Sequence, residues 1–433
     1  MSFLCPSDFL ARHNTTFKRE FIAACTTFVT MAYIVTIAPH MLAQAGVPYG
    51  AAFTATCLVV IVGSILSACF ASLPVAFAPG LGLLSFFSYV VVAQLHYSWK
   101  MGLGMVFVAG VIFFLLTVSR IRQVVLQAIP PSLGSAIAAG IGFFIAFIAL
   151  RNVHLVVSNS HTLLALGVVH SEQLVLFFTG FVLIAVLDAH QVPGAILLGI
   201  LGVTLLSTLL GLNPIDHWVS LPSSLSGSWL HMSLHGWHST QWMSVVFTFV
   251  IVALFDSTGT LLALTQMLPQ QNEKARYRQI NRGLLAESVT TVFSALLGST
   301  TVSPMVENSA GLRAGGRTGV TALLIALFFC AMLFLSPLAK SIPIYATSSA
   351  LFYVGCLMVK PFAHVDWHEP SEYIPAVITL LMIPLTFSIS DGVGLGLICY
   401  TVLKVASGKW KNLHPFIWVL TVVFLVYFVA GNV

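Results

Sequence analysis

Long apolar stretches, separated by short polar segments, recur along the whole chain. As helices, stretches of about 17 to 25 residues are long enough to cross a hydrocarbon core about 30 Å thick. The pattern predicts spans at 20–42, 51–72, 75–95, 101–119, 133–150, 172–189, 193–212, 242–266, 283–298, 302–314, 318–338, 344–359, 373–389, 391–407 and 415–431. An even-numbered bundle needs one span fewer, so either the last segment is an extra or interfacial helix, or two neighbours form one broken span.

The composition indicates lipid as the main solvent. Of the 433 residues, 58% are hydrophobic and 7% are charged, and the mean hydropathy is +0.98. A water-soluble domain of this length carries far more charge. We therefore expect an all-α polytopic membrane protein of about 14 transmembrane segments that is embedded in the lipid bilayer.

The distribution of Lys and Arg predicts the orientation. With a cytoplasmic N-terminus and alternating spans, all but Lys100, Arg151 and Lys340 of the 18 basic residues fall inside, as the positive-inside rule requires. The net charge of +5 thus reflects topology and requires no nucleic-acid partner. The first apolar run lacks a small-residue cleavage site, so we expect an insertion signal that is not cleaved. The expected location is the cell inner (plasma) membrane.

Two predicted spans cannot be crossed by an intact helix. Pro79 and Gly80 interrupt 72–87, and Pro304 and Gly311 interrupt 300–316. Unpaired backbone groups in lipid cost several kcal/mol each, so such breaks persist only inside protein or along a cavity. Two breaks at equivalent places in two halves of seven spans are typical of secondary transporters built from inverted repeats, with substrate held where the half-helices meet. Pro and Gly are also commoner in membrane helices generally, which is the structural alternative.

Two carboxylates fall within predicted spans. Asp256 lies inside the eighth span, and Glu307 opens the half-helix of the second broken span. An ionised carboxylate at the bilayer centre costs about 2.5 to 3.5 kcal/mol, so it marks a functional site by default. A carboxyl group in a low dielectric can exchange a proton near neutral pH, as proton coupling requires. In the structural alternatives, Asp256 ties its helix to a neighbour and Glu307 only complements a helix N-terminus.

No metal, disulfide or catalytic centre is indicated. The seven cysteines are odd in number and unclustered, and the 14 histidines show no ligand spacing. An intramembrane enzyme would need a nucleophile–base or metal constellation inside the spans, and none is visible. We expect no enzyme activity and no cofactor apart from a co-transported proton.

Four co-linear runs resemble one known family. They are REFIAACTTFVTMAYIVTIAPHMLAQAGVPYGAAFTATCL at 19–58, LPVAFAPGLGLLSFFSYVVV at 73–92, ALFDSTGTLLAL at 253–264 and ENSAGLRAGGRTGVTALL at 307–324. Together they are similar to the Azg-like purine permeases of the nucleobase–cation symporter superfamily, over nearly the whole chain. The resemblance implies a seven-plus-seven inverted repeat, divided into core and gate domains, that imports hypoxanthine, guanine or adenine with a proton.

The resemblance also implies roles for individual residues. Glu307 would bind the purine ring, and Asp256 would take part in proton coupling. The other residues expected at the substrate site are Phe77, Ala78, Leu84, Ser85, Ala253, Pro304 and Asn308, with Gly80, Gly82 and Ser303 in a second tier. Phe77, Ala78 and Pro304 would contribute backbone.

The resemblance divides the whole chain into units. It also allows, without requiring, a homodimer. The predicted units are a cytoplasmic N-terminus at 1–19, a first repeat at 20–212 with core spans 20–119 and gate spans 133–212, an external loop at 213–241, a second repeat at 242–407 with core spans 242–338 and gate spans 344–407, and a C-terminal helix at 408–433.

The chain departs from the family pattern at two positions. Relatives usually read GLNAFF in the first broken span and VDLFD in the eighth, and here Leu84 replaces the Asn and Ala253 replaces the first Asp. A buried polar group without its partner costs about 1 to 3 kcal/mol. Although Ser85 would restore one hydrogen bond, we expect altered purine specificity or weak affinity. The alternatives are a same-fold carrier of another nucleobase or a small anion, and a degenerate paralogue that does not transport.

Overall fold

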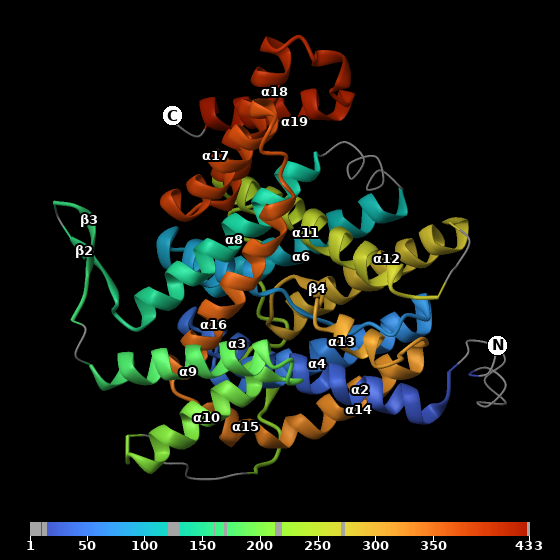
Figure 1. Cartoon of the computed structure of the whole chain (residues 1–433), viewed down its shortest axis with the longest axis vertical. Coiled ribbons are helices and arrows are strands. Elements are labelled where there is room, and N and C mark those ends of the chain that lie inside the picture. The colour runs from blue at the N-terminus through green and yellow to red at the C-terminus, as the bar shows by residue number, and fades with distance from the viewer. Residues whose placement is uncertain are drawn as a thin grey trace.

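The computed structural model describes residues 10, 15–119, 130–159, 161–168, 171–212, 219–269 and 273–430. These residues form a helical bundle with two short two-stranded ladders (Figure 1). Nine helical segments of this part are long and apolar enough to cross a membrane, and four further apolar helices are shorter. Each predicted span has a helical counterpart, which confirms the all-α polytopic fold. Arg12, Arg120 and Arg122, expected on the cytoplasmic side, lie outside the described residues.

The first half of the chain opens with a bent span and contains the first broken span. Its elements are α2 (Phe17–Met31), α3 (Ile34–Gln44), α4 (Tyr49–Leu66), η1 (Ser67–Ala71), β1 (Phe77–Pro79), α5 (Leu81–Ser85), η2 (Phe86–Gln94), α6 (Trp99–Val118), α8 (Pro131–Asn152), β2 (Val156–Asn159), β3 (Leu163–Leu166), α9 (Glu172–Ala189) and α10 (Ala195–Leu209). The hairpin β2–β3 projects beyond the end of α8 (Figure 1).

The second half repeats this order around the second broken span. Its elements are η3 (Leu225–Gly227), α11 (Thr240–Gln266), α12 (Glu273–Leu297), β4 (Val302–Pro304), α13 (Asn308–Arg313), α14 (Gly319–Met332), η4 (Leu333–Leu335), α15 (Ser336–Lys340), α16 (Ile344–Val359), η5 (Lys360–His364), α17 (Pro370–Thr386), α18 (Ile389–Ala406), η6 (Trp410–Asn412) and α19 (Pro415–Ala430). The last apolar segment is therefore a separate helix, α19, which packs on α18.

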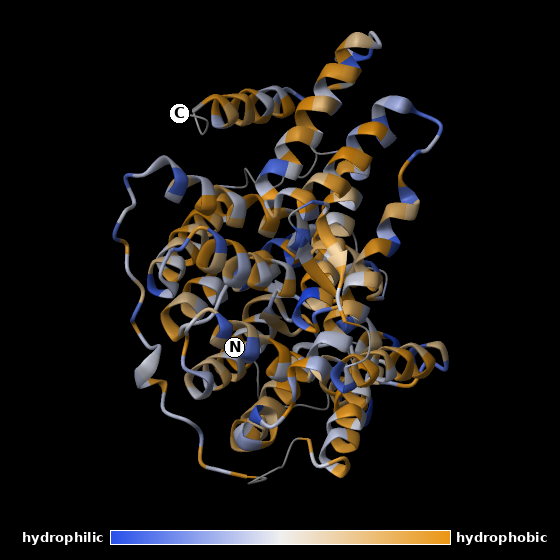
Figure 2. Cartoon of the chain, turned by 90° about the vertical axis from the view of Figure 1, so that its left-hand side faces the viewer, coloured by the Kyte–Doolittle hydropathy of each residue, from blue (hydrophilic) through white to orange (hydrophobic). Residues whose placement is uncertain are grey.

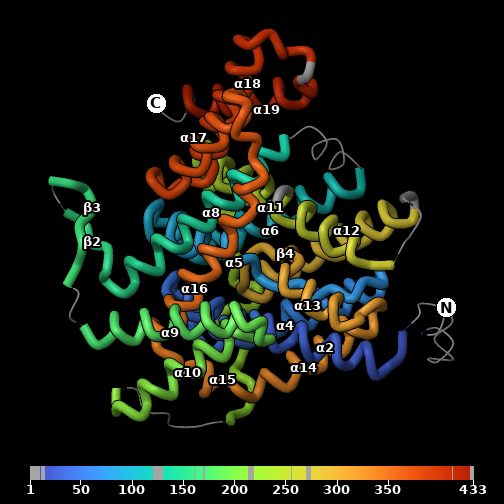
Figure 3. The backbone as a smooth tube through the Cα atoms, in the orientation of Figure 1, coloured from blue at the N-terminus to red at the C-terminus, as the bar shows by residue number. Residues whose placement is uncertain are grey.

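The packing of the helices repeats between the halves. Helix α4 contacts α14 as α6 contacts α12, and α8 contacts α17 as α16 contacts α9. The two contacts in each comparison are counterparts when the halves are exchanged, as an inverted repeat requires. We call the predicted core spans, α2–α6 and α11–α15, the core domain, and the predicted gate spans, α8–α10 and α16–α18, the gate domain. Figure 3 shows the N-terminal helices α2 and α4 beside α13 and α14 at the lower right, where α2 contacts both α13 and α14.

The outer helices present apolar side chains to their surroundings. On α9, Val175, Phe178, Val182 and Val186 are all exposed. Figure 2 shows most helices hydrophobic along their length, with hydrophilic segments frequent in the connections. Lipid chains satisfy such a surface, whereas water would not, so the exposed apolar residues support a position within a bilayer.

A charged cluster ties three gate helices together. The side chain of Lys404 on α18 is only 8% exposed, and its Nζ lies 2.8 Å from Glu372 Oε1 and 3.6 Å from Glu369 Oε1. Glu372 on α17 also accepts hydrogen bonds from Ser132 of α8 and Tyr400 of α18. The cluster therefore joins α8, α17 and α18 at one end of the gate domain.

Glu369, at the start of α17, adds a more exposed ion pair to this cluster. Lys409 Nζ donates to Glu369 Oε1 over 2.5 Å. This donor, followed by Ser371, lowers the pKa of Glu369 to about 2. A lowered pKa means that the contribution of Glu369 to stability is complete above its ordinary pKa, about 4.3, and is lost as the pH falls towards about 2. The pairing therefore persists at every physiological pH.

We expect Lys404→Met to destabilise the gate domain, because it leaves Glu372 without its cation in a largely buried place. Breaking a buried pair by removing one partner costs about 3 to 5 kcal/mol. The measurement is thermal unfolding of the purified protein in detergent, with Lys409→Met as the control. The Lys409 side chain is 44% exposed, so its removal should change the melting temperature little. Equal melting temperatures for the two variants would contradict this assignment.

Candidate functional site

The two broken spans meet as a short antiparallel ladder. Strand β1 pairs with β4 in the register Phe77 with Pro304, Ala78 with Ser303 and Pro79 with Val302. The ladder lies near the middle of the molecule, where Figure 1 labels β4. Backbone groups that the breaks remove from their helices are thus satisfied by each other instead of facing lipid. The predicted pair of extended stretches at broken helices is confirmed.

The half-helices start from this crossing. Helix α5 begins at Leu81, directly after β1, and α13 begins at Asn308, four residues after β4 ends. The crossing is too tight for a side chain at Gly80, because a Cβ there would lie 2.8 Å from Ser303 Oγ and 3.6 Å from Asp256 Oδ2. Glycine at this position therefore lets the first half-helix start beside Asp256.

Asp256 projects from α11 into this crossing. Its carboxylate accepts a hydrogen bond from Ser303 of β4. Although Asp256 lies in the bundle, its side chain is exposed, because it opens on an internal cavity. The second-tier residue Ser303 is thus a partner of the acid beside the break.

The cavity lies between the core and gate domains and has a volume of about 400 Å³. Small-molecule sites commonly have volumes of about 300 to 1,000 Å³. Its wall comes from α5, α8, α11, α16 and η5. The lining residues are Gly82, Leu83, Pro130, Pro131, Gly134, Ser135, Ile137, Ala138, Ile141, Val252, Asp256, Gly259, Thr260, Met358 and Pro361. Among these described residues, Asp256 alone is ionisable.

Glu307 directly precedes α13 and is half-buried beside the cavity's acid. Tyr33 donates its hydroxyl hydrogen to Glu307 Oε1 over 2.5 Å. Glu307 lies close enough to Asp256 for the two carboxylates to interact electrostatically. In the described part of the chain, the ion pairs involve Lys404 and Lys409, so neither acid is paired with a cation. Each carboxylate accepts a hydrogen bond from a hydroxyl group, and Glu307 also accepts one from its own backbone N–H.

Asn308 holds the two broken spans together. Its Oδ1 accepts from Ala76 N over 2.8 Å, and its Nδ2 donates to Ala76 O over 2.9 Å and to Met305 O over 2.6 Å. The side chain is fully buried. Because both donor hydrogens are committed to the backbone, the structure gives Asn308 a bracing role where the sequence predicted a substrate contact.

Other predicted contacts are also buried away from the cavity. Leu84 and Ser85 are fully buried, and the Ser85 hydroxyl donates to Leu81 O over 2.7 Å within its own helix. Ala253 is 5% exposed. The cavity is lined by the preceding residues, Leu83 and Val252. Leu84 and Ala253 therefore stand behind the wall of the cavity in this structure.

The side chains of the ladder residues are also buried in the protein interior. Phe77 is fully buried in a cluster with Val59, Leu261 and Val302. Ala78 is fully buried, and Pro304 is buried too. That the backbone of Phe77, Ala78 and Pro304 lines the substrate site stays a prediction.

Sequence reasoning missed two kinds of residue at this site. Tyr33 was one of ten tyrosines, and only the fold brings it to Glu307, 274 residues away in the chain. The gate wall from α8, including Gly134 and Ser135, was likewise not named. A polar aromatic residue inside an otherwise apolar first span was the available signal for Tyr33.

The opposite end of the domain interface is closed. Tyr89 OH donates to Gln44 Oε1 over 2.6 Å, and Asn152 Nδ2 donates to Tyr89 OH over 3.3 Å. This network links the core elements α3 and η2 to the end of α8. The 400 Å³ cavity contacts the start of α8, and a helix of 22 residues spans about 33 Å. The space next to the network is only about 10 Å³.

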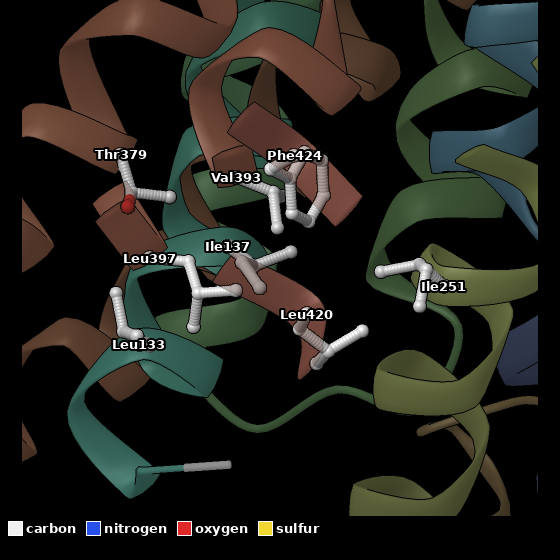
Figure 4. Close-up of a pocket in the computed structure, with 8 residues that line it drawn as sticks. All are labelled: Leu133, Ile137, Ile251, Thr379, Val393, Leu397, Leu420 and Phe424. Atoms are coloured by element: carbon white, nitrogen blue, oxygen red, sulfur yellow. The ribbon is translucent and has the colours of Figure 1, made fainter. Parts of the chain in front are cut away.

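A second internal space, shown in Figure 4, is too small and too apolar for the site. It measures about 10 Å³. Its only polar side chain, Thr379, donates to Pro375 O over 2.9 Å. It is a packing gap where gate helices, α11 and α19 meet, lined by Leu133, Ile137, Ile251, Thr379, Val393, Leu397, Leu420 and Phe424.

Comparisons with known proteins agree with this arrangement. The model of the Permease family matches residues 18–395. The chain is 39% identical over 416 residues to the adenine permease AdeP of Escherichia coli, covering 96% of this chain and 94% of that protein. It is 36% identical over 433 residues to the guanine/hypoxanthine permease PbuO of Bacillus subtilis, covering 96% and 98%.

A solved structure shares the fold. The transmembrane domain of a cyanobacterium bicarbonate transporter, BicA, superimposes with a TM-score of 0.65 at 16% identity, covering 88% of this chain and 97% of that one. At this identity the likeness concerns the fold alone.

Proposed function

Because the chain belongs to the Permease family, we propose that it is a secondary transporter that imports a purine nucleobase together with a proton across the inner membrane. Its relatives at 39% and 36% identity are named adenine and guanine/hypoxanthine permeases, which supports a purine base as cargo. The N-terminus would lie in the cytoplasm, as the positive-inside rule predicts.

The observation that carries the proposal is a pair of acids without a cation at the junction of two broken helices. Asp256 and Glu307 have only the hydroxyl groups of Ser303 and Tyr33 as side-chain donors in the described structure. A carboxylate in the membrane interior costs free energy unless it is neutralised. A proton and a ligand rich in N–H donors together supply that neutralisation, which couples the two binding events.

The chemistry of the cavity favours a flat, neutral donor over an anion. Carboxylates accept hydrogen bonds, and a purine base presents adjacent ring N–H groups to them. Three glycines and Ala138 on the wall leave room for a planar ring between Asp256 and α8. An anion carrier would require basic groups, and the only ionisable residue on this wall is an acid.

The open and closed ends of the interface fit an inward-facing state. The cavity adjoins Pro130 and Pro361, at the ends of α8 and α16 that the basic residues place on the cytoplasmic side. The Gln44, Tyr89 and Asn152 network would then close the external end. Transport requires the gate domain to shift against the core so that these two ends alternate.

The test is uptake of labelled adenine, guanine, hypoxanthine, xanthine and uracil by cells lacking their own carriers. The proposal predicts accumulation of at least one purine, little accumulation of uracil, and loss of accumulation when a protonophore is added. Accumulation of none of these bases, or a uracil preference, would reject the substrate class. Accumulation that is insensitive to the protonophore would reject proton coupling alone.

Leu84 and Ala253, which stand where relatives usually have Asn and Asp, predict an altered purine specificity. Guanine and hypoxanthine should bind more weakly than to relatives that keep both polar residues. The sequence predicts that restoring them with Leu84→Asn and Ala253→Asp raises apparent affinity about tenfold, since a buried hydrogen bond lost without replacement costs about 1 to 3 kcal/mol. Their place behind the cavity wall predicts little change instead. Folded abundance is measured in parallel, because both positions are buried. Tight guanine uptake by the unaltered protein, unchanged in the double variant, would contradict this prediction.

A further inference from the structure

The first span bends at Tyr33, and the bend is fixed by its backbone. Helix α2 ends at Met31 and α3 begins at Ile34. The carbonyl oxygen of Tyr33 accepts from Thr36 N over 3.0 Å, Ile37 N over 3.1 Å and Thr36 Oγ1 over 2.7 Å. Three donors on one carbonyl hold this turn firmly, so the position from which the Tyr33 side chain extends is well defined.

The side chain of Tyr33 is built into the core and ends on Glu307. Tyr33 is 1% exposed and packs within the main apolar cluster. Its hydroxyl donates to Glu307 Oε1, and no other side-chain hydrogen bond to Glu307 is present among the described residues. The Tyr33 hydroxyl and the backbone N–H of Glu307 together restrict the orientation of the carboxylate, and four lone-pair positions on its two oxygens leave acceptor sites for a ligand.

A second contact holds the same two elements in register. Helix α13, which Glu307 precedes, packs on α2. The approach is so close that a Cβ on Gly311 would lie 2.0 Å from Thr27 Oγ1. Only a glycine fits here, and it keeps Glu307 within reach of Tyr33. The hydroxyl contact is thus supported by the packing of the helices on either side.

We propose that Tyr33 is the positioning residue of the binding carboxylate: it orients Glu307 for the substrate and does not itself contact the ligand. This inference rests on the proposed role of Glu307 in binding a nucleobase. A tyrosine hydroxyl both donates and accepts, so the contact can persist whether Glu307 is ionised or protonated. A carboxylate held in its binding geometry loses less conformational freedom when the ligand arrives, which raises affinity.

The transport test compares Tyr33→Phe with Tyr49→Phe. Tyr49 is the matched control, because its hydroxyl is buried without a hydrogen-bond partner. In uptake of the preferred purine, Tyr33→Phe should raise KM about tenfold at similar folded abundance, with a smaller change in maximal rate, as expected for loss of one charge-assisted hydrogen bond. Tyr49→Phe should change neither. An unchanged KM in Tyr33→Phe would overturn the inference while leaving the proposed function intact.

A double-mutant cycle separates positioning from direct contact. Equilibrium binding of the purine to purified protein is measured for Tyr33→Phe, Glu307→Gln and the double variant. If Tyr33 acts through Glu307, Tyr33→Phe should weaken binding less than twofold in the Glu307→Gln background, compared with about tenfold alone. Equal effects in both backgrounds would overturn the inference.

A third readout requires no substrate. The infrared difference between the unaltered protein and Glu307→Gln isolates the carboxyl bands of Glu307. Tyr33→Phe should shift these bands, whereas Tyr49→Phe should not. Bands that stay in place in Tyr33→Phe would overturn the contact itself, even if no nucleobase were transported. Failure of the proposed function, seen as no uptake by the unaltered protein, is therefore distinguishable from failure of this inference.

Discussion

A Glu307→Gln variant is expected to lose high-affinity purine uptake while remaining folded. The amide keeps the size of the side chain and one acceptor oxygen, but it removes the negative charge and places an N–H₂ group where an acceptor is required. Hydrogen bonds to a charged group contribute about 1.5 to 3 kcal/mol, so we expect apparent affinity to fall roughly 10- to 100-fold. The measurement is initial uptake rate against substrate concentration, normalised to folded protein.

The matched control for this experiment is Glu172→Gln. Glu172 is an exposed carboxylate at the start of α9, far from the ladder in sequence and on a gate helix that does not line the cavity. Its replacement makes the same chemical change and should leave uptake unaltered. Normal uptake by Glu307→Gln would contradict a role for Glu307 in binding the substrate. The acid at the start of the half-helix would then have no explained function.

The architecture could be predicted because lipid leaves few structural choices. About 20 apolar residues in a row must form a helix, and Pro79 with Gly80, or Pro304, breaks one. Gly311, also predicted as a breaker, lies inside α13 and allows close packing on α2 instead. The apolar pattern therefore located every span and both breaks. The register of β1 with β4 could not be predicted, because the pairing of Phe77 with Pro304 joins residues 227 positions apart and is set by the packing of other helices.

The acids of the site could be predicted, but most of their surroundings could not. Asp256 and Glu307 stand out because each is a charge within an apolar run. Asn308 resembles a ligand contact because it opens the half-helix after Glu307, yet its amide is used to brace Ala76 and Met305. Leu84 and Ala253 illustrate the remaining limit, because their neighbours line the cavity in their place. A helix rotation of about 100° per residue decides which neighbour faces a cavity, and sequence alone does not fix that rotation.

The two acids differ in access, and from this difference we infer which of them carries the coupled proton. Asp256 is exposed on the cavity, whereas Glu307 is half-buried and held by Tyr33. We therefore expect Asp256 to exchange the coupled proton with the aqueous phase and Glu307 to bind the base. The two carboxylates interact electrostatically, so protonation of Asp256 changes the charge that Glu307 and its ligand experience.

Asp256→Asn should consequently separate binding from coupling. With one proton per base, a pH difference of one unit supports about tenfold accumulation, and the variant should show almost none. Exchange of internal for external base requires no net proton movement, so it should continue at a measurable rate. The experiment compares accumulation and exchange in proteoliposomes with and without an imposed pH gradient. If Asp256→Asn still accumulates its substrate along that gradient, the proton is carried elsewhere, and Glu307 becomes the group that must both bind the base and take up the proton.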